Sequence, residues 1–154
     1  MRRFALVLGL VALTSAPAAA QGRKIRVDGI RALAFGPLLA GAPAKVVRTD
    51  PARSGQFDIT AQNNDLVILS FSLPTSMSGP AGTSLPLTFS GSDAGFSQVQ
   101  SIGDQVAFDP RQAYVATMGQ QGVSSIFLGG TATPAFNQPP GVYTATITLT
   151  VMYP

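Results

Sequence analysis

The chain has 154 residues, of which 45% are hydrophobic and 11% charged, and its formal net charge is +3. It contains no cysteine, which excludes disulfides and thiolate metal sites. Histidine, glutamate and tryptophan are also absent, so the commonest general base and most zinc ligand sets are missing.

Residues 1–20 are predicted to be a secretory signal peptide. Arg2 and Arg3 precede an apolar run over Phe4–Leu13, and the small residues Ala18–Ala20 suit a cleavage site after Ala20. The exported chain would be one domain over residues 21–154, in the periplasm, at the cell surface or secreted. No later stretch is long and apolar enough to span a membrane.

Loss of Arg2 and Arg3 leaves eight basic against seven acidic residues, a net charge of +1. Most of the basic residues lie before residue 54, and we interpret them as a solvated N-terminal arm. No aromatic residues alternate with them as base-stacking platforms would, so a nucleic-acid partner is not expected.

From Ile25 onward, short apolar runs are separated by Gly, Pro, Ser and Asn. Alternation over Gly55–Ala61 places Phe57, Ile59 and Ala61 on one face, and Leu66–Leu73 has its better core face at Val67, Leu69, Phe71 and Leu73. Further runs are Ile25–Val27, Leu33–Leu39, Lys45–Thr49, Leu85–Phe89, Val99–Phe108, Ser124–Leu128 and Thr131–Thr133. Many short strands with Gly/Pro turns, and no helical period, predict an all-β antiparallel sandwich or barrel.

The last segment gives the clearest pattern in the chain. After Gly141, apolar or aromatic side chains alternate mainly with threonine. The inward set is Tyr143, Ala145, Ile147, Leu149, Val151 and Tyr153. This period of two predicts one long strand over residues 143–153 with a single buried face.

The residues offer little chemistry, so an enzyme is not expected, and neither is a cofactor or metal. Asp104 and Asp109 could pair as acid and base in a hydrolase, but each lies in a turn-like dipeptide. The Asn63–Asp65 cluster is interpreted as a turn, because the ligand spacing of a calcium loop is absent.

The segments Leu33–Gly36, Leu128–Thr131 and Gln138–Thr146 resemble the bacterial family called domain of unknown function 4402. That family is related to spore coat protein U and to the pilin domains of archaic chaperone–usher systems. Phe57–Ala61 and Ser72–Pro74 fall where the family has similar segments, so the resemblance covers nearly all of residues 21–154. It implies an immunoglobulin-like, pilin-like antiparallel β-sandwich.

The resemblance also implies a mechanism. Pilin subunits have a penultimate Tyr and a Gly fourteen places from the end, as Tyr153 and Gly141 are here. Their sandwich lacks its last strand, and a periplasmic chaperone or the N-terminal arm of a like subunit fills the groove. The partner-strand interface would comprise Gly141, Tyr143, Ala145, Ile147, Leu149, Val151 and Tyr153. The candidate donor arm offers only Ile25 and Val27, interrupted by basic residues, and Tyr143–Tyr153 would equally suit an inner strand of a complete sandwich.

The leading hypothesis is therefore a non-enzymatic, exported structural or adhesive domain, pilin-like, assembled by strand addition at the cell surface. The alternative is a monomeric secreted binding module, for example for carbohydrate, using the loops Gln62–Asp65 and Ser90–Ser97.

Overall fold

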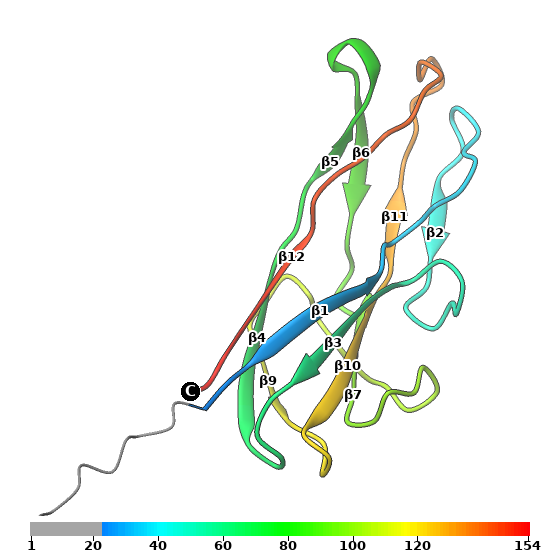
Figure 1. Cartoon of the computed structure of the whole chain (residues 1–154). Coiled ribbons are helices and arrows are strands. Elements are labelled where there is room, and N and C mark those ends of the chain that lie inside the picture. Colours follow the sequence, from blue (N-terminus) through cyan, green and yellow to red (C-terminus); the bar gives the residue numbers. More distant parts are fainter. Residues whose placement is uncertain (1–22) are drawn as a thin grey trace, which may run out of the picture.

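A computed structural model describes residues 23–154, which form an all-β fold with one short 3-10 turn at Pro80–Gly82 (Figure 1). The predicted signal peptide and its cleavage site lie outside the described residues. The strands are β1 (Arg26–Arg31), β2 (Ala44–Val46), β3 (Gly55–Thr60), β4 (Leu66–Ser72), β5 (Ser76–Ser78), β6 (Ser84–Thr88), β7 (Ala94–Ser97), β8 (Val106–Phe108), β9 (Tyr114–Thr117), β10 (Val123–Leu128), β11 (Gly130–Ala132) and β12 (Thr148–Met152).

The strands form three sheets, and every pairing is antiparallel. The five-stranded sheet has the order β1-β3-β10-β7-β8, the four-stranded sheet β2-β11-β6-β5, and the three-stranded sheet β12-β4-β9. The predicted all-β, antiparallel fold class is thereby confirmed.

The main core lies between the five-stranded and three-stranded sheets. Ile59, Val67, Leu69 and Ile126 are completely buried there, and Phe71 and Leu73 pack against the same cluster. The inward faces predicted for β3 and β4 are thus the ones that the fold buries, because successive side chains of a strand point to opposite faces. A smaller cluster of Met77, Leu85, Leu87 and Ala132 forms the core of the four-stranded sheet.

The chain passes from one sheet to another with a single residue between strands. β10 ends at Leu128 and β11 begins at Gly130, so only Gly129 separates the five-stranded from the four-stranded sheet. A Cβ at Gly129 would collide with the Val46 carbonyl oxygen and lie 2.9 Å from the Arg48 nitrogen. Glycine is therefore required where the backbones approach closely.

The prediction of one continuous strand over residues 143–153 is wrong, because β12 comprises only Thr148–Met152. Thr148 pairs with Ser72, and the next pairing is the isolated bridge of Thr144 with Ser78. Between these two pairs, the three residues 145–147 lie opposite the five residues 73–77, and the longer segment contains Pro74. Because proline has no N–H to donate and the lengths do not match, the ladder is interrupted at residues 145–147.

Three strands, β5, β7 and β9, lie outside the runs that alternation predicts. All four residues of β7 are buried, so it has no alternation for sequence reasoning to detect. The run Leu33–Leu39 forms no strand, and only Val106–Phe108 of the run Val99–Phe108 is a strand. Among residues 23–154 no helix has the length and hydropathy needed to cross a membrane.

Candidate functional site: a groove beside the last strand

Two strand edges are free on one side of the molecule. Among the described residues, β12 pairs only with β4, and β1 pairs only with β3. Figure 1 shows these two strands running close to one another near the chain terminus. The Arg23 guanidinium lies 5.6 Å from the centre of the Tyr153 ring. This contact joins the segment just before β1 to the segment just after β12. A strand edge without a partner presents N–H and C=O groups that another strand can bind.

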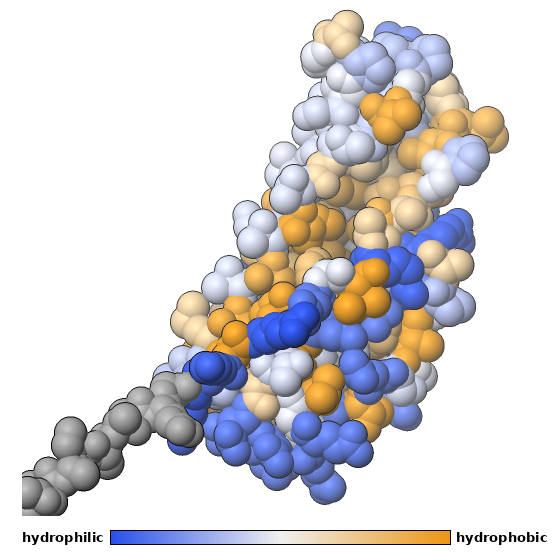
Figure 2. Space-filling model, viewed as in Figure 1, coloured by the Kyte–Doolittle hydropathy of each residue, from blue (hydrophilic) through white to orange (hydrophobic). Residues whose placement is uncertain are grey.

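The edges enclose a hollow of about 340 Å³. Ala145 and Ile147 line it on the side of the last strand, Gly29–Leu33 line the other side, and Phe57 and Leu128 lie behind. Figure 2 shows apolar side chains gathered along this face, between β12 and the more polar surface around β1. The hollow is therefore an apolar groove bordered by two free backbone edges.

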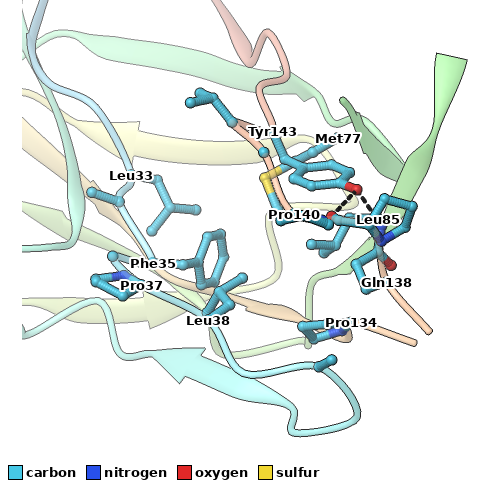
Figure 3. A pocket seen from close by; sticks show the side chains of 16 residues that line it. Leu33, Phe35, Pro37, Leu38, Met77, Leu85, Pro134, Gln138, Pro140 and Tyr143 are labelled. Carbon is cyan, nitrogen blue, oxygen red and sulfur yellow. Dashed lines mark hydrogen bonds between the residues drawn. The ribbon is translucent and has the colours of Figure 1, made fainter. Parts of the chain in front are cut away.

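The groove continues into a second hollow of about 720 Å³, with Leu33 common to both. Apolar side chains from several segments line this second hollow, including Phe35, Leu38, Met77 and Leu85 (Figure 3). The two hollows together form an extended groove along the open side of the sandwich, which we call the open groove.

The polar groups beside the second hollow already have partners. The Tyr143 hydroxyl donates to the Pro139 carbonyl (2.8 Å) and accepts from Gln138 Nε2 (2.7 Å), as Figure 3 shows. Gln138 Oε1 accepts from the Ala135 N–H at 3.2 Å. This part of the groove can therefore bind apolar groups but has little hydrogen bonding to offer through these two side chains.

In the last segment, the predicted alternation largely decides which side chains are half-buried and which are exposed. Tyr143, Ile147, Leu149, Val151 and Tyr153 are half-buried, and the residues between them are exposed. Ala145 is exposed and lines the groove. Gly141 borders the second hollow, where a Cβ would collide with the Pro80 ring.

The two ends of this segment are anchored. The Tyr153 hydroxyl accepts a hydrogen bond from the Gln62 N–H at 3.0 Å, and Tyr143 contacts the small core beside Met77. Residues 145–147, between these anchors, make no backbone hydrogen bond with another described segment. The open groove therefore borders a fixed segment whose central backbone groups lack a strand partner.

Of the candidate donor residues, Val27 lies in the domain's own sheet and Ile25 directly precedes β1. Val27 pairs with Ile59 in the β1–β3 ladder, and Ile25 packs against the main core. A donor role for these residues would require β1 to leave its sheet, so the donor arm remains a prediction.

The two loops suggested for carbohydrate do not line the open groove. Gln62–Asp65 is a tight turn in which Asn64 has a φ of 58°, and the Met118 N–H donates to the Asp65 carbonyl. In the other loop Asp93 is buried and Ala94–Ser97 is β7.

Asp104 and Asp109 have different surroundings. Arg111 binds Asp109 through hydrogen bonds of 2.9 and 2.8 Å, and these bonds lower the pKa of Asp109 to about 2. Asp104 lines a separate hollow beside Tyr114, of which Asp109 is not part. A carboxyl with so low a pKa is ionised at neutral pH and cannot serve as a general acid.

Sequence reasoning missed the wall of the groove that comes from Leu33–Leu38, Met77 and Leu85. The only sequence signal for this wall was an apolar run interrupted by Gly36 and Pro37. Glycine and proline disfavour a regular strand there, and the apolar side chains of the run still need apolar neighbours. The chain matches none of the protein-family models compared with it, and no curated protein matches it in sequence.

Proposed function

We propose that this chain is an exported, non-enzymatic structural or adhesive domain of the pilin-like type, and that its open groove accepts a β-strand from another polypeptide. The partner would be a periplasmic chaperone or a like subunit. The single observation that carries the proposal is the free edge of the last strand beside an apolar groove.

The order of the strands supports an immunoglobulin-like assignment. An immunoglobulin constant-type sandwich has strands A, B, E and D in one sheet and C, F and G in the other. If β1, β3, β4, β7, β10 and β12 are taken as A to F, the five-stranded sheet begins A-B-E-D and β4 lies beside β12 as C beside F. Among residues 23–154, no strand takes the place of G, which would be next to β12.

The groove has the features that strand addition needs. Backbone groups along an open edge supply affinity, and hollows that take alternate side chains supply selectivity. Here the edge is residues 145–152, and the hollows are those bordered by Ile147 and Tyr143. An incoming strand with apolar side chains at every second position would complete the three-stranded sheet and cover the groove.

Co-expression with a periplasmic strand-donating chaperone tests the proposal, with Ala145→Arg as the disruptive variant. Ala145 is exposed and faces the groove, so arginine there would obstruct it without removing a core side chain. Thr146→Arg is the matched control, because Thr146 is the next residue, is also exposed and does not line the groove.

We expect the unaltered chain and Thr146→Arg to elute from gel filtration as an equimolar complex with the chaperone, and Ala145→Arg as a free monomer. A monomer in all three cases would count against strand addition and favour the secreted binding module. Equal complex formation by both variants would show that the partner binds elsewhere.

A further inference from the structure

The charges of this protein lie away from one end of the fold. Residues 32–44, 66–92 and 112–154 contain no charged side chain. The loops over residues 36–43, 79–83 and 133–143, which belong to these segments, lie at the end of the molecule that carries β5, β6 and β11 (Figure 1). Within the four-stranded sheet only Lys45 is charged, and it pairs with Asp93 at 3.7 Å.

The same end carries the three most exposed large apolar side chains of the described chain. Phe136 is 92% exposed, Val142 80% and Leu39 78%. Leu39 belongs to the β1–β2 loop and the other two to the β11–β12 loop. We call these three residues the apolar tip.

The apolar tip is held in place by backbone contacts. The Gly41 N–H donates to the carbonyls of Pro134 and Ala135, at 3.2 and 3.0 Å. The Phe136 ring lies over Gly41, where a Cβ would be 2.7 Å from ring atom Cε1. The two loops therefore form one fixed unit, and the exposure of Phe136 and Leu39 does not come from a loose segment.

We propose that the apolar tip inserts into the surface of a lipid bilayer. Moving a charge into an apolar medium is costly, and the end of the fold that would approach the bilayer has no unpaired charged side chain to desolvate. The polar side chains Gln138 and Tyr143, just below the tip, have their hydrogen-bonding groups engaged with one another and with backbone. The three apolar side chains of the tip offer a partner apolar contact, which fits acyl chains, while the exposed amide of Asn137 beside Phe136 can stay hydrated among the lipid headgroups.

A second copy of the chain fits the tip less well than a bilayer does. Stable protein interfaces bury ~800 Å² on each partner and draw on about 20–30 residues a side. The apolar tip offers three side chains on projecting loops, a shape suited to entering a fluid layer. In Figure 1, β1 runs from beside the C-terminus to about the middle of the molecule, so its basic residues lie away from the tip and insertion would not depend on anionic lipid.

The test uses the purified chain and phosphatidylcholine vesicles, which carry no net charge. The sequence contains no tryptophan, so Phe136→Trp introduces a single indole fluorophore at the tip. Val106→Trp is the control, since Val106 is 62% exposed but lies on β8, outside the uncharged segments.

We expect the indole emission of the Phe136→Trp variant to shift to shorter wavelength with vesicles and to be quenched by brominated acyl chains, in low or high salt. The emission of the Val106→Trp variant should respond to neither. In flotation assays, Leu39→Ser and Phe136→Ser should each lower the partition coefficient about tenfold or more, because burying such a side chain is worth about that factor. Val106→Ser should leave it unchanged.

Three results would overturn the proposal. One is the absence of binding to neutral vesicles. The second is binding only to anionic vesicles and its loss in high salt, which would assign the interaction to the basic residues. The third is self-association that Phe136→Ser abolishes without vesicles, which would assign the tip to a second copy. None of these results bears on chaperone binding, so this proposal and the open groove fail independently.

Discussion

Replacing Gly129 by alanine should destabilise the fold through a backbone collision at the junction of two sheets. The new Cβ would overlap the Val46 carbonyl oxygen and lie 2.9 Å from the Arg48 nitrogen and 3.1 Å from the Val47 carbonyl carbon. All three atoms belong to backbone, so no side chain can rotate away. Overpacking of this kind costs about 1–3 kcal/mol, and the neighbouring strands β2 and β11 would have to move apart.

Gly29→Ala is the matched control, because a Cβ at Gly29, which lies in β1, would meet nothing within 4 Å. Thermal unfolding followed by circular dichroism should place the midpoint of Gly129→Ala roughly 3–10 °C below that of the unaltered chain. Gly29→Ala should unfold within roughly 2 °C of it, since a surface substitution usually changes stability by less than ~0.5 kcal/mol. Equal midpoints for the two variants would refute the close approach at the sheet junction.

Three further substitutions test separate parts of the structure. Ala81 has a φ of 51°, which disfavours a side chain, so Ala81→Gly should raise the free energy of unfolding by up to about 1 kcal/mol in urea titration; a loss of stability would contradict the left-handed conformation. Tyr153→Phe removes the acceptor for the Gln62 N–H and should lower the free energy of unfolding by about 1 kcal/mol, with faster hydrogen exchange at Gln62. Bonding to Arg111 lowers the pKa of Asp109 from 3.8 to about 2, so its stabilising effect is complete above pH 4 and is lost as the pH falls through 2. The unfolding midpoints of Asp109→Asn and the unaltered chain should therefore differ above pH 4 and converge near pH 2, and a constant difference would contradict this ion pair.

The regular parts of the fold were accessible from sequence because their side chains alternate. Val67 and Leu69 are buried and Ser70 and Ser72 are not, as the period of two predicts. The same rule found the half-buried side chains of the last segment, Tyr143, Ile147, Leu149, Val151 and Tyr153, but not the exposure of Ala145. It failed on β7, whose residues are all covered, and on the length of β12, which depends on Pro74 in the segment opposite.

The groove could be anticipated only in outline. Alternation identified Tyr143, Ala145 and Ile147 as one face. It could not decide whether a further strand lies beside this segment and covers that face, since this depends on how distant strands pair. The opposite wall comes from Leu33–Leu38, which has no periodic signal, and the exposure of the apolar tip depends on how two loops meet at Gly41. Such features arise from long-range packing and are not encoded in local patterns.

The most direct test of a groove that accepts a strand is amide hydrogen exchange along residues 145–147, with and without a peptide of alternating valine and threonine. We expect fast exchange of these three amides in the free chain and slow exchange when the peptide is bound, with a peptide of the same composition in scrambled order as the control. If the three amides are already protected in the free chain, or if neither peptide changes their exchange, the groove is not a strand-binding site.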